Sequence, residues 1–409
     1  MLIDGIKNHF RRLTDNPLIV SYLIWLIPRV GIIFLSYFNV LPIALSTGYT
    51  VGGIVVSYHY PGYMLFSKLV HILTFNNYIT YVLMHCAVAS LGGICVYRLS
   101  TLLGYRSSLK WISVIGVGFM PYYFSATLFQ PQFSVAFMVT TWWIVEVYHW
   151  FLEPLSKKRA TWASVASLIA YLFRPYIIGL FILILGCILR FIYKKNRPKE
   201  ALIKIVYSVF IFAFCFLLVK GVNSYFNIRM IANNGIANMV MGNNEYIPEL
   251  AQKHNHSGWL EAINIPNTII QKFGGAETKE EENQILLNYM IDFIKNNPTQ
   301  VLKNIGWKTY RFFDWRLDDA DIESKFKNLL YTVPYILYMP LGFLGALLLL
   351  YSNHKKEKLS LYLLIIAFYS IHIFIFQGCV RTRMYIEAIP IMFAVYTTHV
   401  GINKLKHFN

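Results

Sequence analysis

Arginines stand at places where the chain is otherwise apolar. Arg29 lies inside an apolar run, Arg174 separates two such runs, and Arg381 and Arg383 come directly before another. An ionised group at membrane depth costs about 2.5–3.5 kcal/mol, so it is retained for a partner or a function. The planar guanidinium forms paired hydrogen bonds to phosphate oxygens, and these arginines are predicted to bind a lipid phosphate. Snorkelling or internal pairing is the alternative, above all for Arg383 with Glu387 four residues later.

A second group of polar residues lies in a long hydrophilic segment. Its members can hydrogen-bond, carry positive charge or accept a proton: Asn243, Asn244, Glu245, Lys308, Arg311 and Asp314. Clusters of asparagine and glycine usually form only turns, and a solvated helix cap would explain the acidic patch that begins at Asp314. His254 and His256 form one His-x-His pair without a third ligand at a recognisable spacing, so no metal site is predicted. A requirement for a divalent metal stays open.

The amino-acid composition indicates that these polar residues belong to a membrane protein. Of 409 residues, 56% are hydrophobic and only 14% are charged, whereas an ordinary soluble domain has about a quarter charged residues. Runs of roughly 18 apolar residues, the length that spans a bilayer core, recur along the sequence. The chain is therefore predicted to be an all-α, polytopic membrane protein. A soluble enzyme, a DNA-binding protein and a disulfide-stapled secreted domain are excluded.

The net charge of +17 reports orientation rather than a nucleic-acid partner. The basic residues gather in short segments at every second connection between apolar runs, and no cluster alternates with aromatics on a soluble face. Positive charge in short loops marks the cytoplasmic side. We therefore expect a multi-pass protein of the cytoplasmic (inner) membrane, with both termini in the cytoplasm.

About ten spans are predicted from these runs. They cover Leu18–Phe38, Tyr78–Tyr97, Trp111–Phe124, Phe133–Trp150, Thr161–Phe173, Tyr176–Phe191, Leu202–Val219, Leu329–Tyr351, Leu359–Phe376 and Tyr385–Val400. The fifth and sixth are expected to form a hairpin broken at Pro175. Residues 1–220 then make an N-terminal transmembrane module that includes the first outer loop, 221–328 make a mostly helical extracytoplasmic domain, and 329–409 make C-terminal transmembrane helices.

Helical spacing is clear inside the outer segments. Tyr60–Leu73 is amphipathic, and Glu277–Ile294 repeats apolar residues at helical intervals. Asn297-Pro298 begins a further helix, with proline at its first position. That last helix combines basic and aromatic residues, a pattern typical of a helix at the membrane interface.

The first outer loop contains Ser46-Thr47-Gly48-Tyr49 and then Tyr58–Phe66, which reads Tyr-His-Tyr-Pro-Gly-Tyr-Met-Leu-Phe. This resembles the Tyr-Pro-Pro-Gly-Tyr-Pro-Leu-Phe stretch of polytopic glycosyltransferases of the type C membrane fold, relatives of the protein O-mannosyltransferases and aminoarabinose lipid A transferases. Three further stretches are similar: Arg174-Pro175; Gly242–Asn244 with Asn297-Pro298 and Lys308–Trp315; and Arg381–Arg383 before Ile386–Pro390. The likeness covers most of the chain in order, although each motif is short.

The resemblance implies a sugar donor linked to polyprenyl phosphate, held against membrane lipid, and a glycan, lipid or protein of the cell envelope as acceptor. No further cofactor is expected. The donor phosphate would meet Arg381, Arg383, Arg174 or Lys68, with Lys308 and Arg311 as secondary candidates. The sugar would face a cavity near Tyr49, His59 and Tyr60. Arginines would stabilise the leaving phosphate as the glycosidic bond breaks.

One departure from the family concerns its general base. The family has an acidic residue in the first outer loop, but this chain has no Asp or Glu from Pro17 to Val145. A hydroxyl at Ser46 or Thr47 cannot take a proton at neutral pH without a base beside it. His59, Glu245 or Asp314 is therefore expected to substitute, unless the usual chemistry has been lost.

Two other functions fit parts of the sequence. An O-antigen polymerase or ligase combines many spans, a large outer loop and arginines, and needs no carboxylate in the first outer loop. A non-catalytic transporter of lipid-linked saccharides would show internal repeats and broken helices in matching halves, and no such symmetry is seen. The missing acid favours the polymerase, and the Tyr-Pro-Gly-Tyr and Arg-Pro stretches favour the glycosyltransferase.

Overall fold

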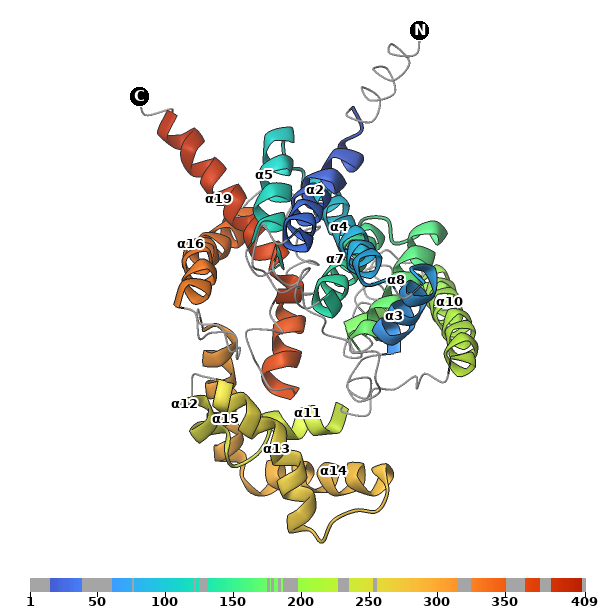
Figure 1. The fold of residues 1–409 in the computed structure, drawn as a ribbon, viewed down its shortest axis with the longest axis vertical. Helices are drawn as coiled ribbons and strands as arrows, with labels where there is room; N and C mark the ends of the chain where they lie inside the picture. The colour runs from blue at the N-terminus through green and yellow to red at the C-terminus, as the bar shows by residue number, and fades with distance from the viewer. Residues whose placement is uncertain are drawn as a thin grey trace. The chain divides into compact units, whose positions relative to one another are not determined.

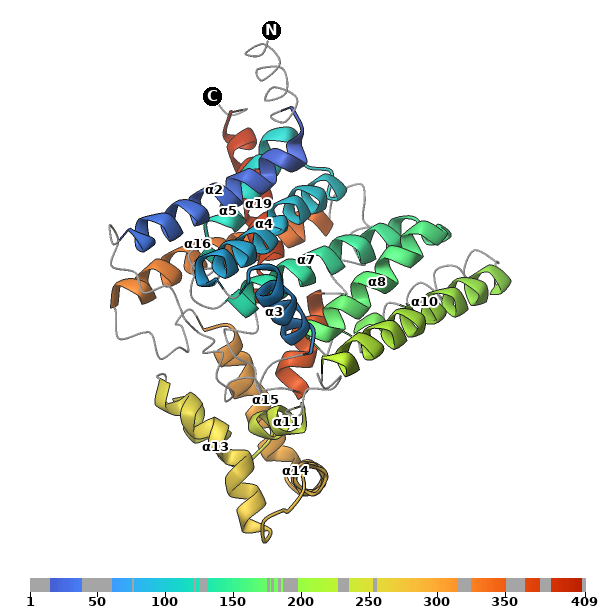
Figure 2. The ribbon, with the colours of Figure 1, turned by 45° about the vertical axis from the view of Figure 1, so that its right-hand side comes forward.

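The protein is described by a computed structural model, whose ribbon is drawn in Figures 1 and 2. It describes residues 15–38, 61–75, 77–120, 123–124, 131–174, 177, 180–182, 185–186, 198–226, 235–252, 256–314, 325–350, 365–375 and 384–406. The described residues are helical and include no strand. This confirms the all-α fold class.

The chain divides into two compact units. The first comprises residues 1–231, 338–362 and 385–409, and the second comprises 232–337 and 363–384. Two of the boundaries between the units fall within helix α16 (Lys325–Leu350) and within the short 3-10 helix η4 (Met384–Ile386). Each unit has its own packing.

The first unit is built from long apolar helices. They are α2 (Pro17–Tyr37), α4 (Tyr78–Leu102), α5 (Ser107–Gly118), α7 (Pro131–Leu152), α8 (Lys157–Phe173), α10 (Pro198–Tyr225) and α19 (Ala388–Lys406), with the shorter α3 (Pro61–Leu73). Helices α2, α4, α7, α8 and α10 pack side by side in that order (Figure 2), and α5 lies against α2, α4 and α19.

Five described segments are long and apolar enough to cross a membrane: Pro17–Tyr37, Ile79–Leu102, Phe133–Leu152, Leu202–Tyr225 and Tyr331–Leu349. Ala388–Ile402 is apolar but shorter. The predicted span Trp111–Phe124 differs, because α5 ends at Gly118 and rises only about 18 Å over its length. The predicted spans Tyr176–Phe191 and Leu359–Phe376 lie partly outside the described residues.

Helix α2 is anchored by one tryptophan. The indole Nε1 of Trp25 donates to the carbonyl of Val114 on α5 at 2.9 Å. A Cβ added at Gly92 or Gly118 would come within 2.6 or 2.3 Å of the Trp25 ring. Glycine at both positions therefore makes room for the ring, and the small residues let three helices approach closely.

Helices α16 and α19 approach each other through glycine as well. A Cβ at Gly345 would lie 2.1 Å from the carbonyl oxygen of Phe393, which is backbone and cannot rotate away. The hydroxyl of Thr397 donates to the carbonyl of Leu341 at 2.7 Å, which holds the same pair of helices together.

Gly345→Ala is therefore expected to destabilise the protein by about 1–3 kcal/mol, because the added methyl group forces the two backbones apart. Thermal unfolding in detergent measures the change. Gly31→Ala on α2 is the matched control, since a Cβ there meets nothing within 4 Å. Equal melting temperatures for the two variants would refute the close approach.

The second unit is a small helical domain. It contains α11 (Gly235–Gly242), α12 (Ile247–Gln252), α13 (His256–Lys272), α14 (Lys279–Asn296), α15 (Pro298–Phe312), the first part of α16 and the π-helical turn η3 (Ile371–Ile375). Thr278 and Glu281 form a capping box that begins α14, and Pro298 occupies the first turn of α15. The helix begun by Asn297-Pro298 is thus confirmed.

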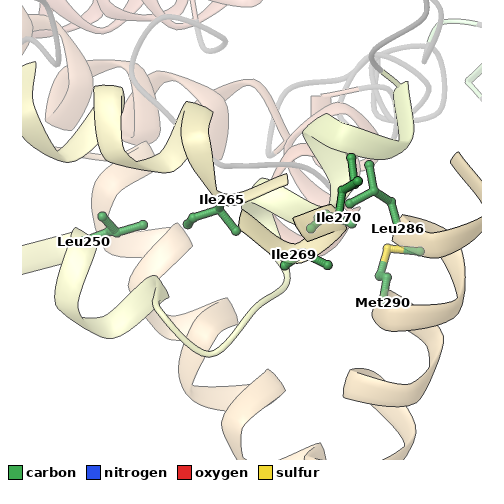
Figure 3. Packing of buried hydrophobic residues seen from close by; sticks show 7 residues of the cluster. Leu250, Ile265, Ile269, Ile270, Leu286 and Met290 are labelled. Carbon is green, nitrogen blue, oxygen red and sulfur yellow. The ribbon is translucent and has the colours of Figure 1, made fainter. Parts of the chain in front are cut away.

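Aliphatic side chains form the core of this unit (Figure 3). Ile265 and Ile269 on α13 and Leu286 and Met290 on α14 repeat at intervals of four residues, so each pair faces inward on its helix. Leu250 joins them from α12. This core gives the hydrophilic segment a packed scaffold on which polar residues can be held in place.

Candidate functional site

Five predicted site residues lie outside the described residues: Tyr49, His59, Tyr60, Arg381 and Arg383. The other predicted residues fall in two places. Asn243, Asn244, Glu245, Lys308, Arg311 and Asp314 belong to the second unit, and Lys68 and Arg174 belong to the first.

Helix α15 buries its polar side. Asn304, Lys308 and Arg311 follow each other at intervals of four and three residues and therefore form one stripe, and all three are buried. Leu302 and Tyr310 are exposed on the same helix. An interfacial helix would direct its cations to water and headgroups. Here Lys308 and Arg311 are buried instead, and neighbouring elements supply oxygen acceptors to Lys308.

The ammonium of Lys308 is the centre of this stripe. Its side chain is 2% exposed. Nζ donates to Oδ1 of Asn243 at 3.1 Å and to the carbonyl of Phe374, in η3, at 3.2 Å. Both acceptors are neutral, and no carboxylate in the described part of the chain pairs with Lys308. A buried cation held only by dipoles is suited to binding an anion.

Burial also changes the acidity of this group. Loss of water around the ammonium lowers the pKa of Lys308 from 10.5 to about 8. The lysine is therefore still mostly protonated at neutral pH, and a bound anion would favour its charged form further.

Asn244 and Asn304 fix the backbone conformation of the turn beside Lys308. The Nδ2 of Asn244 donates to the carbonyl of Val240 at 2.8 Å, and its Oδ1 accepts from the backbone N–H of Tyr246 at 2.9 Å. The carbonyl of Asn244 accepts from Nδ2 of Asn304 at 2.7 Å. The turn after α11 is thereby tied to α15, and this places Asn243 against Lys308.

Asn304 was not among the predicted site residues. It is fully buried, and its Oδ1 accepts from Gln300 at 3.0 Å, one turn earlier on α15. The signal in the sequence was a run of hydrogen-bonding residues at helical intervals on one face, Gln300, Asn304, Lys308 and Arg311.

The two candidate bases of this unit have different surroundings. Glu245 is exposed, and its carboxylate accepts a hydrogen bond from the hydroxyl of Tyr289. Burial and this carboxylate raise the pKa of Tyr289. Asp314 is buried and follows the end of α15, three residues after Arg311. Asp314 thus lies at the end of the helix that carries the buried cations, whereas Glu245 faces water.

Arg174 lies at the end of α8 and is buried between aromatic rings. Its guanidinium carbon is 4.1 Å from the ring centroid of Tyr385 and 5.6 Å from that of Phe133. Stacking of this kind stabilises a cation by about 0.5–2 kcal/mol. The rings keep the guanidinium in one orientation.

Lys68 makes a structural contact. Its Nζ donates to the carbonyl of Phe226, directly after α10, at 2.6 Å. The last carbonyls of a helix lack partners within the helix, and a lysine there also interacts favourably with the helix dipole. Lys68 therefore ties α3 to the end of α10.

Arg29 and Glu146 also have hydrogen-bond or ion-pair partners inside the first unit. The guanidinium of Arg29 donates to the carbonyls of Trp25 at 2.8 Å and Gly118 at 2.9 Å, and this joins α2 to α5. Glu146 on α7 pairs with Arg98 on α4 at 2.8 Å. Glu146 is the first carboxylate after the acid-free stretch of the sequence, and its partner in the structure is an arginine of the neighbouring helix.

Among the described residues, no three His, Cys, Asp or Glu side chains gather in the way that a metal ion would require.

Comparison with protein-family models, with curated proteins and with solved structures found no significant match.

Proposed function

We propose that the chain is an integral-membrane glycosyltransferase that moves a sugar from a polyprenyl-phosphate-linked donor to a cell-envelope acceptor. In this proposal it has about ten spans in the inner membrane, both termini lie in the cytoplasm, and transfer takes place on the outer face. The acceptor is a glycan, a lipid or a protein. Nucleic acid has no part in the reaction.

The observation that carries this proposal is the buried Lys308 with its neutral hydrogen-bond partners. In sugar transfer, the bond between the anomeric carbon and the phosphate oxygen breaks, and the phosphate leaves with increased negative charge. A preorganised cation in a site without bulk water stabilises this charge strongly. Arg311, buried on the same face of α15, is the second candidate for the phosphate.

The acceptor hydroxyl has to lose its proton as its oxygen attacks the anomeric carbon. We propose that Asp314 takes this proton. Its support is its position next to the cationic face of α15, in contrast to the exposed Glu245 bonded to Tyr289. His59 remains the alternative base in the first outer loop.

An O-antigen polymerase or ligase is the second candidate function. It is favoured by the absence of acidic residues from Pro17 to Val145 and by the pairing of Glu146 with Arg98. Such an enzyme would move an entire lipid-linked oligosaccharide.

The proposal is tested with the purified protein in lipid vesicles. Polyprenyl phosphates that carry one radiolabelled sugar are added with an envelope extract, and the label is followed by lipid and glycan analysis. A glycosyltransferase moves the label from the donor lipid into an acceptor. If the label stays on the donor while lipid-linked oligosaccharides are joined, the polymerase or ligase is correct.

A further inference from the structure

Helices α8 and α10 run in the same direction, so their N-termini lie at the same end of the first unit. The hydroxyls of Thr161, in the second turn of α8, and Tyr207, in the third turn of α10, are 2.8 Å apart. Further along, the ring of Tyr171 meets the ring of Phe216, with centroids 6.4 Å apart. Figure 2 shows the two helices side by side. The N-terminal halves of α8 and α10 therefore lie next to each other.

A shallow groove of about 450 Å³ lies on α10 near this end. It is lined by Leu202, Ile203, Val206, Tyr207 and Phe210. Only 6% of the apolar window of Leu202–Tyr225 is buried within the protein. The lining residues are large, whereas helix pairs in membranes associate through small residues. This face is therefore suited to a hydrocarbon chain of the bilayer rather than to a second helix.

Three lysines lie in the first turns of the two helices, on the N-terminal side of the groove. Lys199 is on the same stripe of α10 as Ile203, Val206 and Phe210, at intervals of four, three and four residues. Lys157 and Lys158 lie one turn before Thr161 on α8, on the side that meets Tyr207. All three lysines are exposed, and none forms an ion pair within the described residues.

The nearby acids do not cancel this charge. Glu153 pairs with Arg159 at 3.2 Å. Glu200 is the only acidic residue in the first turn of α10, against the three lysines. The positive ends of two helix dipoles point the same way. The groove thus has an apolar body and a cationic end, which matches an anionic lipid with its headgroup at the lysines.

We propose that α8 and α10 form a binding site for an anionic phospholipid, with its phosphate at Lys157, Lys158 and Lys199 and an acyl chain in the groove. The lipid comes from the leaflet in which the lysines lie. This site is independent of the sugar-transfer proposal, because none of its residues belongs to the second unit.

The test titrates the full chain in detergent with phosphatidylglycerol and with phosphatidylcholine of the same acyl chains, and native mass spectrometry counts bound lipid. One phosphatidylglycerol is expected to bind tightly, and phosphatidylcholine at least about tenfold more weakly. Lys199→Gln should weaken phosphatidylglycerol binding about fivefold, as should Lys157→Gln and Lys158→Gln. Val206→Trp, which fills the groove, should weaken binding of both lipids.

Lys220→Gln is the control, because Lys220 is exposed on α10 but lies near the opposite end of that helix from Lys199. If this variant weakens binding as much as Lys199→Gln, the attraction is diffuse and the site is refuted. Equal affinity for the two lipids refutes it as well. A dimer that Val206→Trp dissociates, with lipid binding unchanged, would assign the groove to a second copy of the chain instead.

Discussion

Lys308→Met is expected to lower kcat/KM for sugar transfer by about 10²–10³-fold, because the buried charge that stabilises the leaving phosphate is lost. Methionine has a similar shape but carries no charge. Lys303→Met is the matched control, since Lys303 is exposed on the same helix. Transfer from a labelled donor and thermal unfolding are measured on both variants. Near-normal transfer by a folded Lys308→Met protein would remove Lys308 from the site.

The same lysine predicts opposite effects of pH on activity and stability. With a pKa of about 8, the native protein loses this proton as the pH rises through 8, and activity that needs the cation should fall there. The unfolded chain keeps the proton up to about 10.5. It therefore binds more protons than the native state between pH 8 and 10.5, and stability should rise by up to about 1.4 kcal/mol per pH unit. Both trends should vanish in Lys308→Met.

Asp314→Asn is expected to lower kcat by about 10²–10⁴-fold, the usual contribution of a general base. The amide preserves the shape of the side chain but cannot take the proton of the acceptor hydroxyl. Glu245→Gln is the matched control, because the Glu245 carboxylate faces water and is bonded to Tyr289. Rates with one acceptor are compared at saturating donor, with circular dichroism to check folding.

A large loss in Glu245→Gln with a normal rate in Asp314→Asn would reverse the assignment of the base. If neither variant is impaired but His59→Gln is, the first outer loop supplies the base and the polymerase-like reaction gains support.

Local patterns in the sequence were enough to predict most helices. Pro298 is a signal that lies within one turn of the helix end it marks. The apolar runs at Tyr78–Tyr97 and Leu202–Val219 likewise predict long membrane-compatible helices. The structure has such helices at Ile79–Leu102 and Leu202–Tyr225. These features depend on neighbouring residues, so no knowledge of the fold was needed.

The end of helix α5 could not be predicted from local sequence patterns. Apolar residues continue beyond Gly118, but the helix stops there. The carbonyl of Gly118 accepts from Arg29, and its missing side chain leaves room for Trp25. The end of α5 therefore packs against Trp25 and Arg29 of α2, which is far away in the sequence.

The sequence by itself determined that this chain is apolar, helical and rich in cations that require a partner. Only the tertiary structure decided which cations are held inside the protein and by what. Lys308 meets Asn243 across 65 residues of sequence, Lys68 reaches Phe226 across 158, and Glu245 is left facing water. Helical periodicity states which residues share a face. The neighbour that covers that face is set by the packing of distant segments, because burial of a polar group is tolerated only where another element supplies its hydrogen-bond partner.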